Sequence, residues 1–215
     1  MTVAELLAKL GGVPAERVRL EPLPGTATEK DVIAVERREG RLCELVDGVL
    51  VEKTMGLEES FLALGIAFFL QGFLKQHDLG FLTGADGAMR LMPGLVRIPD
   101  VSFVSWSQLP TRTIPTKAIP NLHPDLAVEV LSRSNTKAEM ERKLRDYFLV
   151  GTQLVWLVNP RKRTVRVYTA PDESRLLQEE QSLDGGDVLP GLSLPLREVF
   201  AKLETKPAPR KPRKK

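Results

Sequence analysis

Hydrophobic and polar residues alternate along this chain with two periods, one typical of helices and one of strands. The segment MTVAELLAKL at the N-terminus has the apolar spacing of a short amphipathic helix. Thr28 is a suitable N-cap for a second helix that runs to about Arg38. Leu57 to about His77 has helical length and is apolar on so many sides that we expect it to be largely buried across a sheet.

Strand-like runs surround these helices. Asp47-Gly48 stands between two apolar runs, RLCELV and VLVEK, and predicts a β-hairpin because a type I′ turn needs positive φ at both central positions. Further expected strands are FLTG, AMRLM, VRIPDVSFV, DLAVEVLS, LVWLVNP, TVRVYTA and one near Leu176, and Pro99 indicates that the strand in VRIPDVSFV begins or bends there. A Pro- and Thr-rich loop is expected from Ser105 to Pro124.

The segment from Asp125 to Asn159 reads as strand, helix, strand. Asn135 or Thr136 opens the helix, Met140 and Leu144 belong to its apolar stripe, and Gly151 ends it. Such a crossover places its two strands parallel, whereas the hairpins elsewhere are antiparallel. The pattern therefore predicts an α/β protein with a mixed sheet.

Composition narrows the class of protein. The single cysteine, Cys43, excludes an internal disulfide and a cysteine-based zinc cluster, and no signal peptide or membrane span is evident, so we expect a cytoplasmic protein that does not bind membranes. Of the 31 Lys and Arg, six lie in the last ten residues, which leaves 25 basic against 28 acidic residues in the rest. We expect an N-terminal helix and linker over 1–27, a domain over 28–203 and a basic, Pro- and Lys-rich disordered tail over 204–215, which is either a solubilising tail or a weak site for nucleic acid phosphates.

Two carboxylates stand in otherwise apolar strands, Asp100 in VRIPDVSFV and Glu129 in LAVEVLS. Ionised carboxylates are almost never buried without a cationic partner or a metal. A hard cation such as Mg²⁺ takes oxygen ligands, which one or two carboxylates and phosphate oxygens supply. Lys143, two turns into the following helix, could orient an attacking water and stabilise charge on a phosphate.

Each of these residues also has a plainer structural interpretation. Asp100 could cap a turn, Glu129 could pair with Arg133 or Lys143, and Lys143 could pair with Glu139 one turn earlier. The hypothesis of a site rests on the combination of a charged residue in each of two apolar strands with a lysine on the next helix. The segment from Glu129 to Arg166 has nine basic and four acidic residues, a local excess of five positive charges that favours contact with a phosphate backbone.

The phrases CELVDGVLVEK, IPDVSFV, DLAVEVLS and the stretch from Lys143 through Tyr147 to LVWLVNP resemble the Uma-two family of the PD-(D/E)XK nuclease superfamily, over roughly 28–170. The resemblance implies a restriction-endonuclease-like mixed central sheet flanked by helices. It implies that Asp100 and Glu129 are metal ligands, that Lys143 is the catalytic lysine, and that Glu44 faces the same site. The superfamily's usual lysine follows the glutamate by two residues, where this chain has Leu131, so the role would pass to Lys143 on the helix.

The leading hypothesis is a metal-dependent endonuclease that hydrolyses DNA by Mg²⁺-activated water, with Mn²⁺ as a substitute metal. The first alternative is an inactive protein of nuclease fold that binds nucleic acid or regulates. A carboxylate-pair hydrolase acting on sugars is a third candidate, disfavoured because the chain has only two Trp and two Tyr. A homodimer is compatible with the sequence, which identifies no interface.

Overall fold

The structure is a computed structural model and describes residues 2–203. Its helices are α1 (Val3–Lys9), α2 (Glu29–Glu39), α3 (Leu57–Leu74), α4 (Lys137–Leu149) and α5 (Leu196–Phe200), with two short 3₁₀ turns at Ala15–Arg17 and Trp106–Gln108. Its strands are β1 (Cys43–Val46), β2 (Val49–Glu52), β3 (Gly80–Thr83), β4 (Met89–Met92), β5 (Leu95–Arg97), β6 (Val101–Ser105), β7 (Leu126–Val130), β8 (Leu154–Asn159), β9 (Thr164–Tyr168), β10 (Ser174–Gln178), β11 (Ser182–Gly185) and β12 (Leu189–Pro195). The predicted disordered tail lies outside the described residues.

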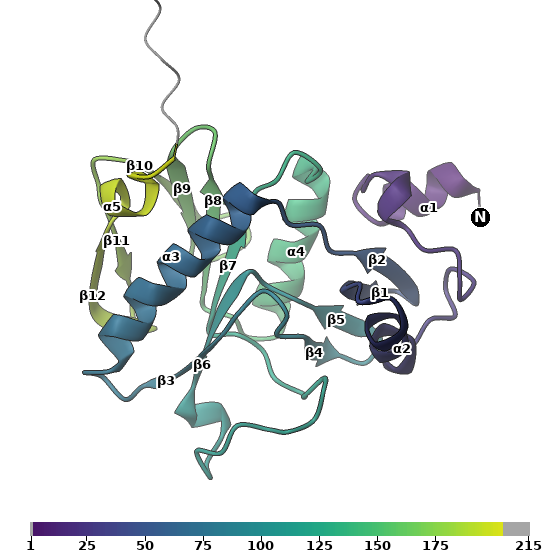
Figure 1. The fold of residues 1–215 in the computed structure, drawn as a ribbon, viewed down its shortest axis with the longest axis horizontal. Helices are drawn as coiled ribbons and strands as arrows, with labels where there is room; N and C mark the ends of the chain where they lie inside the picture. The colour runs from purple at the N-terminus through teal and green to yellow at the C-terminus, as the bar shows by residue number, and fades with distance from the viewer. Residues whose placement is uncertain (1, 204–215) are drawn as a thin grey trace, which may run out of the picture.

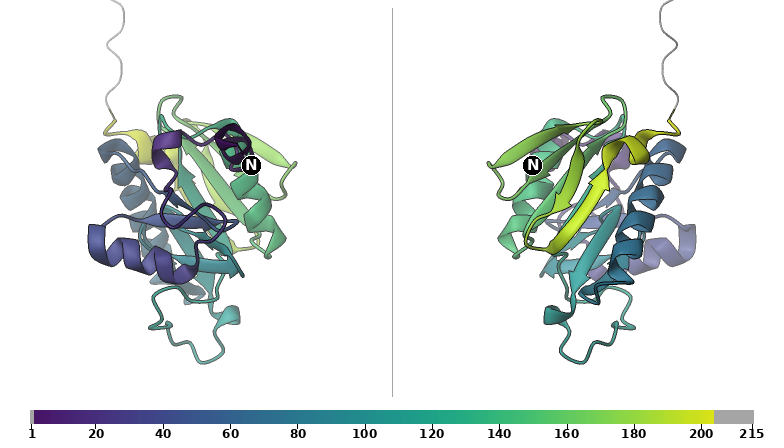
Figure 2. Two further views of the ribbon diagram at one scale, coloured as in Figure 1. Left: turned by 90° about the vertical axis from the view of Figure 1, so that its right-hand side faces the viewer. Right: turned by 90° about the vertical axis from the view of Figure 1, so that its left-hand side faces the viewer.

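A six-stranded mixed sheet forms the centre of the molecule, in the order β10-β9-β8-β7-β6-β3. Strands β7 and β8 are parallel, as the crossover pattern predicted, and all other neighbours in this sheet are antiparallel. Helix α3 packs on one face and α4 on the other, so the sheet is the middle of three layers (Figures 1 and 2). The predicted α/β class and the mixed sheet with flanking helices are confirmed.

A second, four-stranded sheet lies beside the first, in the order β2-β1-β5-β4. Its β1–β2 hairpin turns at Asp47 and Gly48, whose φ values of 51° and 75° are those that the Asp-Gly pair predicted. Helix α2 begins after Thr28, whose backbone N–H donates to the Asp31 carboxylate at 2.8 Å, and packs against β1.

The run VRIPDVSFV is expected from the sequence to form a strand that begins or bends at Pro99. The structure divides it into β5, in the small sheet, and β6, in the large sheet, with a break at Pro99. Proline has no backbone N–H to give to a sheet ladder, and here it stands where the chain passes from one sheet to the other. The segment around Pro99 therefore places the small sheet beside the beginning of β6, where Asp100 lies.

Segments at the two ends of the chain complete the cores. The β11–β12 hairpin and α5, which the hydrophobic pattern did not reveal, close the α3 side of the large sheet through Leu183, Leu194 and Phe200. On the α4 side, α1 and the following loop contribute Leu6 and Val13 to the core. The N-terminal segment, expected as a helix and linker, is therefore packed against the rest of the protein.

Helix α3 is less buried than its composition predicted. Leu62, Ile66 and Leu70 are buried against the sheet, but the opposite face carries exposed large apolar side chains. By length and composition alone α3 could cross a membrane. Its packing on the sheet explains one apolar face as core, and the other face is left unexplained by the fold.

Candidate functional site

Asp100 and Glu129 meet on neighbouring strands of the large sheet. Val101 pairs with Val128 in the antiparallel ladder between β6 and β7, so the next residues outward, Asp100 and Glu129, lie opposite each other. Both are 5% exposed. Like charges directly opposite on a sheet destabilise it unless cations lie beside them, so this placement requires positive charge from another element.

Helix α4 supplies that charge. Its N-cap, Thr136, accepts from the Glu139 N–H at 3.0 Å, and the helix then presents Lys143 toward β7 two turns later. The Lys143 ammonium lies 3.1 Å from each carboxylate oxygen of Glu129. It also lies 3.0 Å from Oε1 of Glu44, which projects from β1 of the small sheet. One buried lysine therefore joins carboxylates from both sheets.

Glu44 is held on its other side by β5. Its Oε2 accepts from Arg97 at 2.7 Å, and its Oε1 accepts from the Ile98 backbone N–H at 3.2 Å. Arg97 also pairs with Asp146 on α4. Burial alone would raise the pKa of Glu44, but Lys143 and Arg97 outweigh it and hold that pKa well below its ordinary range. Glu44 is thus a stable anion at neutral pH.

Asp100 has its own cation, Lys53, which follows β2. The Lys53 ammonium lies 2.8 Å from Asp100 Oδ1 and donates to the Ile98 carbonyl at 2.5 Å. The other oxygen, Oδ2, accepts from the Val130 N–H at 2.6 Å. The turn-capping role considered for Asp100 is therefore replaced by an ion pair and a hydrogen bond across the two strands.

Tyr147 lies one turn beyond Lys143 and is fully buried in the α4 core. Its hydroxyl donates to Glu129 Oε1 at 2.6 Å, so it both packs and fixes the carboxylate. Burial and the neighbouring Glu129 raise the pKa of Tyr147 well above its ordinary value, which keeps the hydroxyl a donor. Burial also raises the pKa of Glu129, and Lys143 opposes this shift only in part.

The structure brings together all four residues that the sequence singled out: Glu44, Asp100, Glu129 and Lys143. It adds Lys53, Arg97 and Asp146, which the sequence did not single out. Arg97 had a usable signal, since it is a charge within the apolar run LVRIP, as Asp100 is in the run that follows. Lys53 had no such signal, because the sequence does not distinguish a buried lysine at the end of a hairpin from an exposed one. The network holds four carboxylates and three cations, by count of its ion pairs.

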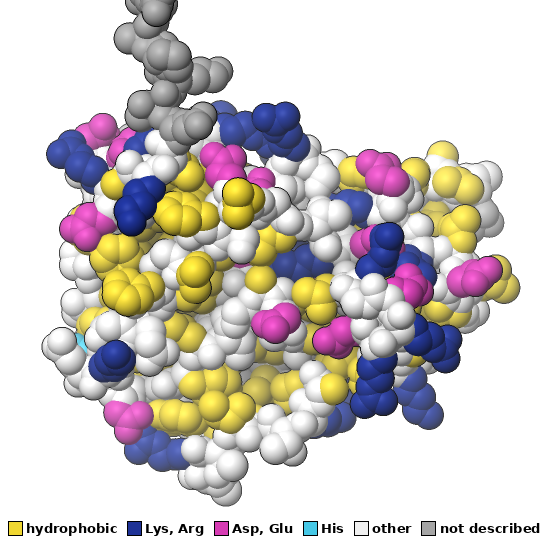
Figure 3. All heavy atoms as spheres, in the orientation of Figure 1, with side chains coloured by type: hydrophobic (Ala, Val, Ile, Leu, Met, Phe, Trp, Pro, Cys, Tyr) yellow, Lys and Arg dark blue, Asp and Glu magenta, His cyan; other side chains and the backbone are white. Residues whose placement is uncertain are grey.

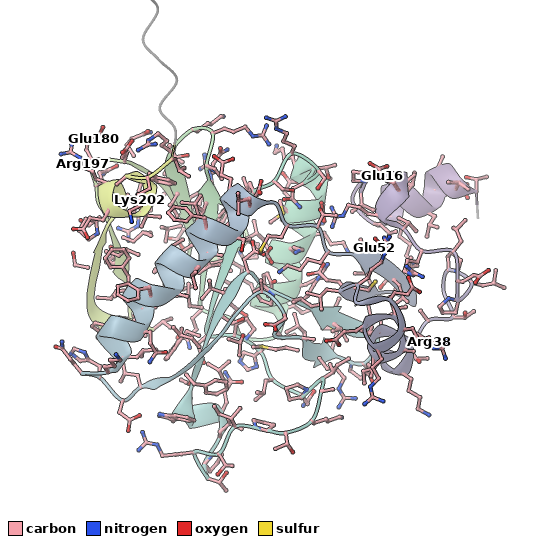
Figure 4. All side chains as sticks on the ribbon, in the orientation of Figure 1. Glu16, Arg38, Glu52, Glu180, Arg197 and Lys202 are labelled. Carbon is pink, nitrogen blue, oxygen red and sulfur yellow. The ribbon has the colours of Figure 1, made fainter. Side chains whose placement is uncertain are left out.

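Two neighbouring acids do not belong to this centre. Glu139, the alternative partner considered for Lys143, instead forms a buried pair with Arg17 at 2.8 Å. Glu52, labelled in Figure 4, directly precedes Lys53 but pairs with Arg19 and Arg41. The centre is therefore defined by its own ion pairs and not by a general excess of acids.

A divalent cation would find hard oxygen donors here, since Asp100 and Glu129 lie opposite each other and the network has one more carboxylate than cations. Both Asp100 oxygens already have partners, and no ready-made group of three or more His, Cys, Asp or Glu ligands occurs within residues 2–203. The donor chemistry fits Mg²⁺, provided that the Lys53 ammonium gives up Asp100 Oδ1. Ligands beyond this pair would come from water and substrate.

A mixed sheet between two helices, with acids on adjacent strands and a lysine beside them, defines a nuclease-like α/β protein. The family model described as "Putative restriction endonuclease", Uma2, matches residues 30–197, and the chain belongs to this family. The solved structure of a "putative nuclease belonging to DUF820" from Anabaena variabilis is similar in fold, with a TM-score of 0.66 at 20% identity over 74% of this chain and 90% of that one. No curated protein matches.

Proposed function

We propose that this protein is a Mg²⁺-dependent endonuclease that hydrolyses DNA phosphodiester bonds at the centre formed by Asp100, Glu129, Lys143 and Glu44. The observation that carries the proposal is the position of Lys143, whose ammonium lies within 3.1 Å of carboxylates from both sheets. Membership of a restriction-endonuclease-like family supports the same reaction class.

Each side chain has a part that follows from its contacts. Asp100 and Glu129 would hold the cation, which would activate water and polarise the phosphate when bound. Tyr147 keeps the Glu129 carboxylate oriented through its 2.6 Å hydrogen bond. Lys143, already charged, would stabilise the negative charge that grows on the phosphate oxygens. Glu129 and Glu44 together keep Lys143 protonated, and Glu44 also holds it in position through its 3.0 Å contact.

A groove next to the centre supports DNA as the substrate. It has a volume of about 600 Å³, lies between α4 and the β8–β9 hairpin, and includes Leu131 and Ser132 directly after the Glu129 strand. Its basic lining residues are Lys137, Arg161, Lys162 and Arg166, against one acid, Glu141. Not all of the nine basic residues counted in the segment 129–166 are available to a phosphate backbone. Arg142 forms an ion pair with Asp47, and Arg163 forms one with Glu179. A groove with this excess of basic residues suits the sugar-phosphate backbone of a nucleic acid.

The centre itself is closed over in this structure. Asp100, Glu129, Lys143 and Glu44 are each at most 5% exposed. The loops after β2 and β7 meet through a hydrogen bond of 2.9 Å between the Thr54 and Ser134 hydroxyls. We expect these loops to separate when a phosphodiester enters, because Lys53 and Leu131 at their beginnings border the acid pair.

A plasmid assay tests the proposal. Supercoiled DNA is incubated with Mg²⁺ or Mn²⁺ and the parent protein, Asp100→Asn, Lys143→Met or the control Arg145→Met, which changes an exposed basic residue of the same helix outside the groove. We expect nicking by the parent and the control, and a loss of at least about 100-fold in the other two. Equal nicking by all four folded proteins, or nicking in EDTA, would contradict the proposal.

The alternative of an inactive nuclease fold is supported by one observation, the Lys53 ammonium on Asp100 Oδ1. A protein without chemistry would bind DNA at the basic groove but would gain no thermal stability from Mg²⁺. The metal titration separates the two functions: Mg²⁺ raises the Tm of the parent but not of Asp100→Asn if the pair binds the cation.

A further inference from the structure

We infer that the exposed face of α3 is the interface for a second copy of this chain, packed antiparallel about a two-fold axis. Along one side of α3 the exposed positions are Leu57, Phe61, Leu64, Phe68 and Gln71, and Lys75 continues the series after the last helical residue. Glu58, Ser60 and Gly72 are exposed beside this row. The intervals within the row are four, three, four, three and four residues, which is the spacing of a coiled-coil seam. The inference does not depend on the proposed nuclease activity.

The four apolar members of this seam are not core residues. Leu57, Phe61, Leu64 and Phe68 are 89, 41, 71 and 76% exposed, while Leu62, Ile66 and Leu70 fill the opposite side against the sheet. Figure 3 shows hydrophobic side chains gathered over the face of the molecule that carries α3. Single exposed apolar residues are ordinary, but a continuous row along one helix marks an interaction surface.

The charges at the ends of the seam favour an antiparallel copy, because a parallel copy would bring Glu58 and Glu59 beside the same acids of the other chain. If the axis passes at the level of Ile66, Leu64 meets Phe68 of the other copy, Phe61 meets Gln71, and Leu57 meets Lys75. This layering of alternate seam positions is that of antiparallel helix pairs. The same register brings acidic Glu58, in the first turn, beside Lys75 of the other copy, so that the ends of the two helices have complementary charge.

The surface beside the seam permits close approach. A Cβ added at Gly65 or Gly72 would meet nothing within 4 Å, so both glycines lie open on the flank of the seam. Two grooves also border α3, one of about 590 Å³ at Leu57 and Leu203 and one of about 450 Å³ at Phe68 and Leu192. They give the side chains of a neighbouring helix room to interdigitate.

The size of the seam sets the strength of association. Helix α3 has 18 residues, or about 27 Å of length, and a helix is about 10 Å wide with its side chains. A single helix pair of this size buries less than the roughly 800 Å² per partner of a standard stable interface. We therefore expect a dimer that forms at micromolar concentration and dissociates on dilution.

A membrane surface is the other occupant for an apolar helix face, and the charges oppose it. Helices that lie on anionic membranes carry Lys and Arg beside the apolar face. The first turn of α3 has Glu58 and Glu59, and the basic residue at its C-terminal end, Lys75, is matched by Glu58 of the other copy in the register above. A second copy would bury the apolar row and would also pair the opposite charges at the two ends of the helix.

Sedimentation of the full chain between about 1 and about 100 µM tests the interface. The parent should pass from the 23.9 kDa monomer toward twice that mass. Leu64→Glu and Phe68→Glu should each weaken association by at least about tenfold. Leu149→Glu is the control, because Leu149 is 73% exposed on α4. A monomer at every concentration, or equal weakening by the control, would overturn the proposal.

Disulfide trapping tests the direction of the pair. A mixture of Leu64→Cys with Phe68→Cys chains should cross-link under mild oxidation, whereas Leu57→Cys alone should not, since the two Leu57 lie at opposite ends of the antiparallel pair. The native Cys43 is buried and does not interfere. Cross-linking of Leu57→Cys with itself would overturn the antiparallel register. Binding of the monomer to phosphatidylserine–phosphatidylcholine vesicles, lost in Phe68→Glu, would assign the seam to a membrane instead.

Discussion

Replacement of Lys143 by methionine should lower the free energy of unfolding more than the same replacement of Lys137, the other lysine of α4. The ammonium contacts Glu129 at 3.1 Å and Glu44 at 3.0 Å, and all three side chains are at most 7% exposed. Burial disfavours the ammonium, yet Glu129 and Glu44 hold the pKa of Lys143 above its ordinary value. Methionine fills a similar volume, so the substitution removes the charge and leaves two buried carboxylates without their shared partner.

The magnitude follows from that loss. Removing one partner of a buried ion pair costs about 3 to 5 kcal/mol. A chain of this size loses roughly 2 to 4 °C of Tm per kcal/mol, so Lys143→Met should melt roughly 6 to 20 °C below the parent. Urea unfolding at pH 7 gives the free energy directly from the shift in midpoint. Lys137→Met, an exposed lysine paired only with Glu141 four residues on, should leave the midpoint within error.

A double-mutant cycle tests the stated cause. Glu129→Gln in the Lys143→Met background removes one of the unpaired charges. The double variant should therefore lose less unfolding free energy than the two single variants lose in sum, by at least about 1 kcal/mol. Strict additivity would refute the contact as the source of the loss. A midpoint for Lys143→Met equal to that of Lys137→Met would refute the buried pair itself.

Three further outcomes follow from single positions. Gly48→Ala should be more destabilising than Gly40→Ala by at least about 1 kcal/mol in urea unfolding, because both have positive φ but only at Gly48 would a Cβ lie 2.6 Å from backbone atoms; equal losses would contradict the clash. Burial raises the pKa of Cys43 to about 11, so iodoacetamide at pH 8 should label it only at the rate of unfolding, and rapid stoichiometric labelling of native protein would show it to be accessible. The pKa of Glu44 is lowered in the fold, so its contribution to stability is present above the ordinary value of 4.5 and is lost as pH falls below it. Glu44→Gln should therefore flatten the loss of unfolding free energy between about pH 5 and about pH 3, and an unchanged slope would contradict the shift.

Local patterns predicted most of the elements of the fold because they depend on near neighbours. Thr28 begins α2 and Asp47-Gly48 turns the hairpin through backbone preferences that are set within a few residues. The break at Pro99 was predictable in this way, but the assignment of β5 and β6 on its two sides to different sheets was not. It depends on which distant strands pair with each half, β1 and β4 for β5, and β3 and β7 for β6.

The same limit applies to the site. Asp100 and Glu129 were recognisable because each interrupts an apolar strand, a local signal of a buried charge. Lys143 came from the resemblance, and the structure places it beside both Glu129 and Glu44. Lys53 was not recognisable, since its burial results from the packing of the small hairpin against the segment before β6, where its ammonium contacts the Ile98 carbonyl 45 residues later in sequence.

The exposed face of α3 shows where composition misleads. A helix that is apolar on all sides normally indicates complete burial in one chain. Here one side is buried in the core and the other carries Leu64 and Phe68 into solvent. Composition predicts the total apolar surface of a helix but not whether the partner of each face belongs to the same molecule.

The charges of the centre link its stability to its proposed chemistry. Four carboxylates and three cations meet between the two sheets, so the small sheet, the large sheet and α4 are joined there, beside their shared hydrophobic core, by ions that the reaction would also use. A divalent cation at the acid pair would turn this excess of one negative charge into an excess of one positive charge if Lys53 stayed. If Lys53 is released from Asp100, its ammonium stays close to the centre and becomes free to face the entering phosphate. On this argument Lys53→Met should strengthen Mg²⁺ binding, measured by thermal shift, while lowering nicking activity. Weaker Mg²⁺ binding in Lys53→Met would show instead that Lys53 holds Asp100 in the orientation that the metal needs.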